Sequence, residues 1–171
     1  MIVLFFIVVF ILLFALQTSL ISYFSVGGVT LDLALILSVY CGVLLRGDRG
    51  IWVGFSIGLF QDCLSGGLLG VNTLSKSIIG FTFSRLKDKL MVEGFVPISV
   101  ILFVASFFDG LVYYLALTTL LKAQIPFSFL FNTLPMYAMV NALVGPIMFF
   151  FLNWSAKRIL RKFPLLEGTS Q

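Results

Sequence analysis

The chain alternates between long apolar runs and short turns that are polar or rich in glycine. A membrane-spanning helix needs about 20 predominantly apolar residues, and the longer runs have this character. We expect six spanning helices, at about residues 2–23, 29–45, 50–64, 71–85, 95–121 and 129–154. The turns between them are too short to form a separate domain. The pattern therefore predicts an all-α polytopic membrane protein with a single integral membrane domain, residues 1–171.

The first run has no charged side chain between Met1 and Leu31. A secretory signal peptide combines a basic start, a shorter apolar core and a cleavage site with small residues. The run lacks the basic start and the cleavage site. We therefore interpret it as a retained helix.

Composition excludes several classes of protein. Hydrophobic residues make up 60% of the chain and charged residues 11%, against about 45–50% and about 25% in soluble domains. Histidine is absent, and Cys41 and Cys63 show no metal-binding spacing. The usual zinc centres and histidine-dependent acid–base chemistry therefore lack a ligand or base. We expect no catalytic residues, no metal, no cofactor and no enzymatic activity.

The net charge of +4 comes mainly from cations that flank the apolar runs, which argues against a nucleic-acid surface. With both termini in the cytoplasm, nine of the 11 Lys and Arg residues lie inside, in agreement with the positive-inside rule. These nine are Arg46, Arg49, Arg85, Lys87, Lys89, Lys157, Arg158, Arg161 and Lys162. Trp52 and Trp154 fall at the same interface, as aromatic anchors do. We expect this basic face to contact anionic lipid.

Two rows of small or polar residues recur at every fourth position in neighbouring runs. The third run carries Gly50, Gly54, Gly58 and Asp62, and the fourth carries Asn72, Lys76, Gly80 and Ser84. Neighbours in such a row share one slowly drifting helix face, and glycine there lets a second backbone approach closely. The rows predict an antiparallel hairpin.

Ionisable side chains within the predicted spans need partners, because each costs about 2.5–3.5 kcal/mol at the membrane centre. We expect Asp62 to pair with Lys76 across the predicted hairpin. The pair is either a clamp that holds the hairpin together or part of a solute- or ion-binding site. The sequence leaves both open.

Asp109 lies near the middle of the fifth run, with Ser106 and Tyr113 on the same helix face. One interpretation is a protonated carboxyl group that is hydrogen bonded to serine, tyrosine or Asn141. The other is a role in contacting a partner or in transport. Asn141 is followed by Gly145 and Pro146, which indicates close packing and a bend in the sixth helix.

An ordered series of residues runs through the third run, the following turn and the start of the fourth. It consists of Gly54, Gly58, Gln61, Asp62, Ser65, Gly66, Gly70 and Asn72. This series resembles the signature of the rod shape-determining protein MreD family, and Asp32, Arg46 and Gly50 also fit it. The motif resemblance covers about residues 32–89, and the length and six-span plan agree over the whole chain. The chain lacks the basic N-terminal flank that many family members carry.

The resemblance implies a non-enzymatic scaffold of the bacterial cell-elongation machinery in the cytoplasmic (inner) membrane. Such a scaffold works beside MreC, a single-span protein. It is linked to MreB filaments and to the RodA–penicillin-binding-protein synthase, and it helps position or regulate peptidoglycan synthesis and rod shape. The resemblance also implies a fold similar to the substrate-binding subunits of energy-coupling-factor transporters.

That fold leaves a second function open, a solute-binding subunit of a vitamin-type importer. Short, glycine-interrupted spans beside a polar cluster are typical of transporter sites. Gene neighbourhood distinguishes the two hypotheses: wall-synthesis genes favour the scaffold, and an energising ATPase favours the importer.

Overall fold

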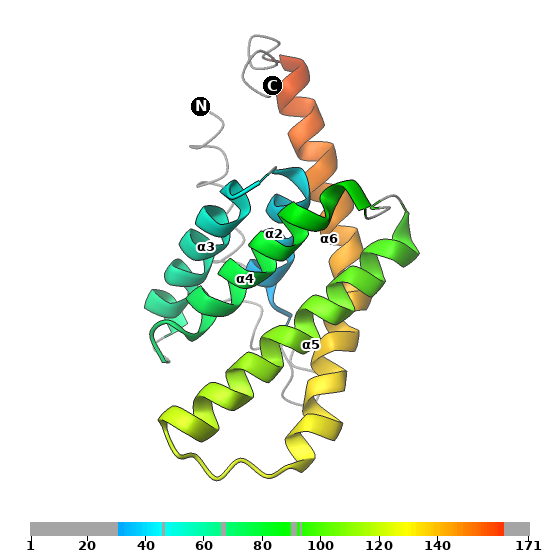
Figure 1. Ribbon diagram of the computed structural model, residues 1–171. Helices are drawn as coiled ribbons and strands as arrows, with labels where there is room; N and C mark the ends of the chain where they lie inside the picture. The colour runs from blue at the N-terminus through cyan, green and yellow to red at the C-terminus, as the bar shows by residue number, and fades with distance from the viewer. Residues whose placement is uncertain (1–30, 46, 66–67, 90–91, 93, 163–171) are drawn as a thin grey trace.

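The protein is described by a computed structural model over residues 31–162, apart from 46, 66–67, 90–91 and 93. Its helices are α2 (Leu33–Leu44), α3 (Arg49–Ser65), α4 (Val71–Leu86), α5 (Phe95–Leu120) and α6 (Leu134–Lys162) (Figure 1). A 3₁₀ turn, η1 (Lys87–Lys89), follows α4, and a π-helical turn, η2 (Phe129–Thr133), precedes α6. The predicted all-α class is confirmed for this part of the chain. The expected first span, 2–23, lies outside it.

Helix length divides these five helices into two groups. Among the residues described, only α5 and the segment Phe129–Ser155, which consists of η2 and most of α6, are long and apolar enough to cross a membrane. The other three have 12, 17 and 16 residues, which at about 1.5 Å per residue is less than the roughly 30 Å of a hydrocarbon core. The number of membrane crossings therefore stays a prediction.

Helix α2 forms the centre of the fold. Every residue from Leu33 to Gly42 is buried, and the helix contacts α3, α4, α5 and α6. A helix that is apolar on all sides is stable only when it is surrounded. The core accordingly joins α2 residues such as Leu35 and Val39 to Leu102 of α5 and Phe149 of α6.

The glycine row brings α3 and α4 into backbone contact. A Cβ added at Gly50, Gly54 or Gly58 would collide with a carbonyl oxygen of α4. These oxygens belong to Gly80, Lys76 and Asn72, respectively. The register is antiparallel and joins the two rows that the sequence pattern pairs.

Helices α5 and α6 form a second hairpin, which extends well beyond α2 at the yellow end of Figure 1. Here a glycine on each helix faces a side chain of the other: Gly110 meets Leu134, and Gly145 meets Leu102. The expected close packing at Gly145 is present. Helix α6 continues through Pro146 without a break.

Candidate functional site: a buried polar cluster

Asp32 caps the start of the central helix. Its Oδ1 accepts a hydrogen bond from the backbone amide of Leu35 at 2.9 Å, a typical N-cap contact. Its own backbone amide donates to Oδ1 of Asn141 on α6 at 3.0 Å. The cap therefore leaves Oδ2 of Asp32 directed at other groups.

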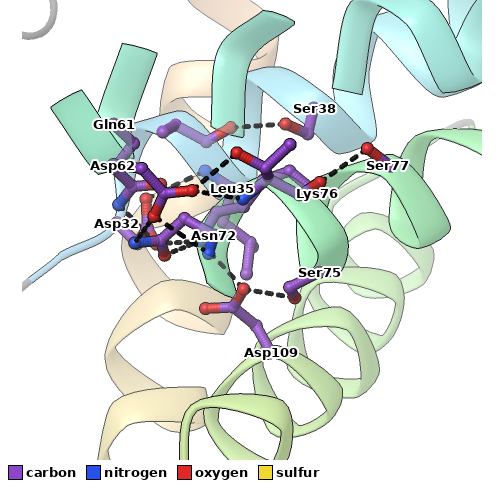
Figure 2. Close-up of polar contacts among 12 residues, drawn as sticks. Asp32, Leu35, Ser38, Gln61, Asp62, Asn72, Ser75, Lys76, Ser77 and Asp109 are labelled. Carbon is purple, nitrogen blue, oxygen red and sulfur yellow. Dashed lines mark hydrogen bonds and ion pairs between the residues drawn. The ribbon is translucent and has the colours of Figure 1, made fainter. Parts of the chain in front are cut away.

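Lys76 of α4 is the centre of the cluster, and its side chain has no exposed surface. Its Nζ donates to Oδ2 of Asp32 at 2.9 Å, to Oδ1 of Asp109 at 2.8 Å and to Oδ1 of Asn72 at 3.0 Å (Figure 2). An ammonium group has three protons, so each has an acceptor. Burying a charge is costly unless it is paired and hydrogen bonded, and Lys76 meets both conditions.

Three neutral side chains complete the cluster. Ser75 donates to Oδ1 of Asp109 at 2.6 Å, and Nε2 of Gln61 donates to Oδ2 of Asp32 at 3.3 Å. The hydroxyl of Tyr137 lies 3.1 Å from Oδ2 of Asp32 and 3.0 Å from Oδ2 of Asp109. Helices α3, α4, α5 and α6 and the N-cap residue of α2 thus each contribute a side chain to one polar network.

Asp62 does not pair with Lys76, so that prediction is wrong. Its carboxylate accepts hydrogen bonds from the backbone amides of Gly70, Asn72 and Thr73 at 2.9, 3.1 and 2.9 Å. The side chains of Asn72 and Thr73 donate to it at 3.0 and 2.6 Å. These amides belong to the N-cap residue and the first turn of α4, where a helix has unpaired donors and favours an anion. A neutral but donor-rich turn therefore satisfies the carboxylate.

Asn72 nevertheless links the two charges. Its Nδ2 donates to Asp62, and its Oδ1 accepts from Lys76. The amide group thus bridges a carboxylate and an ammonium group that do not touch each other.

The partners of Asp109 come from other helices rather than from its own face. Lys76, Ser75 and Tyr137 reach it from α4 and α6. Ser106 is buried, but its hydroxyl has no hydrogen-bond partner, and Tyr113 is exposed. Ser106 and Tyr113, which the sequence places on the same helix face, therefore do not hydrogen bond to the carboxyl group of Asp109.

The remaining motif residues lie in the turn and at the helix ends. Gly70 has a φ of +100° in the turn before α4, a conformation that glycine adopts readily. Ser65 is exposed and donates to the carbonyl of Asp62 at 3.4 Å. Gly66 and Arg46 lie outside the described residues.

The predicted interface residues whose side chains the structure describes are exposed or partly exposed. Trp52 and Trp154 are 70% and 55% exposed, and the guanidinium of Arg158 lies 4.6 Å from the Trp154 ring centroid. Arg85 pairs with Asp48 at 2.7 Å, and Lys87 donates to the carbonyl of Leu44 at 2.9 Å. Arg49 and Lys89 are exposed.

The sequence patterns do not predict three members of the cluster. These are Ser75, Tyr137 and Asp32, the last of which is a partner of Lys76. The one available signal was Asp32, an N-cap residue type that directly precedes an apolar run. Ser75 and Tyr137 give no signal, because their roles depend on how distant helices pack.

In the part of the chain that the structure describes, no three acidic or cysteine side chains are grouped to hold a metal ion. Most donors and acceptors of the cluster are used within it. The oxygen Oε1 of Gln61 is a buried exception without a hydrogen-bond partner. The arrangement can hold helices together and can bind or move a proton.

A family model described as rod shape-determining protein MreD matches residues 1–155. No curated protein and no solved structure matches the chain.

Proposed function

Because this chain belongs to the MreD family of rod shape-determining proteins, we propose that it is a non-enzymatic membrane scaffold of the cell-elongation machinery. The match over residues 1–155 carries the proposal. In this role the chain binds the transmembrane helix of MreC, a single-span protein. It thereby helps position peptidoglycan synthesis along the cell, in contact with MreB filaments and the RodA–penicillin-binding-protein synthase.

The polar cluster supports the role of a scaffold. It joins α2, α3, α4, α5 and α6 through side chains that mainly bond one another. A platform that presents a constant surface to partner helices needs such internal links. Apolar residues on the outer face of α5, including Val96, Val100 and Val104, are available to lipid or to another helix.

We also propose an orientation in the cytoplasmic membrane, with the basic ends of the helices inside. The ion pair of Arg85 with Asp48 joins the end of α4 to the connection between α2 and α3. The C-terminal end of α6 points toward the same end of the molecule in Figure 1, whereas the α5–α6 connection lies at the opposite end. A basic face at this end is suited to anionic lipid.

Depletion in a rod-shaped bacterium that depends on this chain tests the proposal. We expect depleted cells to widen and become round, and re-expression of the chain to restore their width. Affinity purification of the tagged full-length chain from membranes should also recover MreC. Cells that keep their width after complete depletion would contradict the role in shape.

A second candidate function is supported by the position of the cluster beside the turn that separates two short helices. A solute-binding subunit of a vitamin-type importer is expected to have such a site. Depleted cells would then keep their width and lose vitamin uptake, so the same experiment distinguishes the two functions.

A further inference from the structure

The hydroxyl of Tyr137 lies between two carboxyl groups, at 3.1 Å from Oδ2 of Asp32 and 3.0 Å from Oδ2 of Asp109. A phenol donates one proton, and an ionised carboxylate can only accept. If both aspartates were ionised, one of these two contacts would have no proton in it. A proton on one carboxyl group turns both contacts into hydrogen bonds.

The charge balance favours the same proton. Lys76 contributes one positive charge, and the two carboxyl groups that it contacts are each only 8% exposed. Two ionised aspartates would leave a net negative charge in a buried site, which is costly. One protonated carboxyl group makes the trio neutral.

The contacts also indicate which oxygen carries the proton. Oδ2 of Asp32 already faces three donors, on Lys76, Gln61 and Tyr137. Oδ1 of Asp109 faces Ser75 and Lys76, as the carbonyl oxygen of a carboxylic acid can. Among the described residues, Oδ2 of Asp109 has a hydrogen-bond contact with the Tyr137 hydroxyl, and a proton on this oxygen would lie in that contact.

We infer that the cluster binds one proton, on Oδ2 of Asp109, and that Tyr137 relays this proton to Asp32. In the relay, the O–H bond of Asp109 breaks and its proton bonds to Oη of Tyr137. The original O–H bond of Tyr137 breaks at the same time, and that proton bonds to Oδ2 of Asp32. Tyr137 remains a neutral phenol, and the total charge does not change.

Other charged groups take no part in the relay. From α3, Gln61 faces the site with a neutral amide, and Asp62 reaches it only through Asn72. From α4, Lys76 is the cation that both aspartates share. Loss of the proton therefore leaves two ionised carboxylates in contact with the single hydroxyl of Tyr137. This weakens the contact of α5 with α2 and α6.

Infrared spectroscopy of the full chain in lipid bilayers tests this inference without any substitution. At neutral pH we expect the C=O stretching band of a protonated carboxyl group, which shifts in D2O. Labelling aspartate with ¹³C at the side-chain carboxyl should shift it further, because the band arises from aspartate. If the unlabelled and labelled samples show no such band, both aspartates are ionised and the inference is wrong.

Variants then locate the proton. Asp109→Asn should abolish the band, and Asp48→Asn, at an exposed ion pair, should keep it. Asp32→Asn should also abolish it although Asp109 is intact, because Lys76 then pairs with one carboxylate and the trio needs no proton. A band that survives Asp109→Asn or Asp32→Asn would contradict the assignment. Tyr137→Phe should move the band to higher frequency, and an unmoved band would overturn the relay.

Discussion

The ammonium group of Lys76 lies 2.8 Å from Oδ1 of Asp109, although 33 residues separate them in the chain. This contact joins the α3–α4 hairpin to the α5–α6 hairpin, and a second one joins Lys76 to Asp32 on α2. One buried cation thus connects three parts of the fold. Its removal affects all of them at once.

Lys76→Met is predicted to destabilise the protein strongly. The substitution leaves two buried carboxyl groups without their cation, and breaking a buried ion pair in this way costs about 3–5 kcal/mol. Denaturant titration of the purified protein in detergent measures the loss. The matched control is Lys89→Met at an exposed position, where we expect a change within about 0.5 kcal/mol. Equal unfolding midpoints for the two variants would refute the role of Lys76.

Gly54→Ala is predicted to disrupt the α3–α4 hairpin. The added Cβ would collide with the carbonyl oxygen of Lys76, a backbone atom that cannot move alone. Overpacking of this kind costs about 1–3 kcal/mol. Gly110→Ala is the control, because its Cβ meets the flexible end of Leu134, and the same unfolding assay should show a smaller loss. A smaller loss for Gly54→Ala than for Gly110→Ala would contradict the packing described.

Asp62→Asn is predicted to loosen the turn before α4. The carboxylate accepts five hydrogen bonds there, whereas an asparagine amide turns one acceptor into a donor that faces other donors. Unsatisfied buried groups cost about 1–3 kcal/mol. Hydrogen exchange should accelerate at the amides of Gly70, Asn72 and Thr73.

The control for that variant is Asp48→Asn, which removes an exposed ion pair with Arg85. Such pairs contribute about 0–1 kcal/mol, so we expect little change in exchange near Gly70. Unchanged exchange in the Asp62 variant would show that the turn does not depend on the carboxylate.

The proposed orientation predicts opposite accessibility for the two ends of α3. In a background with Cys41→Ala and Cys63→Ala, Ser65→Cys should react with a membrane-impermeant thiol reagent added to spheroplasts. Arg49→Cys should react in inside-out vesicles. Both positions are exposed, so access depends on the side of the membrane. The reverse labelling pattern would show that the chain has the opposite orientation and would contradict the proposal.

The sequence predicts the ends of α3 and α4 well because these limits are local. The apolar runs are interrupted at Arg49, at the turn before Val71 and at the basic stretch after Leu86. These interruptions predict the ends of α3 and α4 to within a few residues of the observed ends. The glycine row likewise predicts the face on which these helices meet, since a residue without a side chain at every fourth position has a direct steric meaning.

The polar cluster could not be derived in the same way. Lys76 has Asp32, Asp62 and Asp109 as possible partners, and the choice depends on the central position of α2. The hairpin pattern pairs Lys76 with Asp62, but amide donors at the N-cap and in the first turn of α4 satisfy the Asp62 carboxylate. Tyr137 lies 105 residues from Asp32 in the chain, and no local pattern distinguishes it from other aromatic residues.

The most direct test of the account is cell width in a depletion strain that expresses the chain or its variants at equal membrane levels. The account predicts rods of normal width with the unmodified chain and with Lys89→Met. It predicts wide, rounded cells with Lys76→Met, because the scaffold needs the cluster that joins its helices. Normal rods with Lys76→Met would show that the function does not need the cluster. Normal rods after full depletion would contradict the role in rod shape.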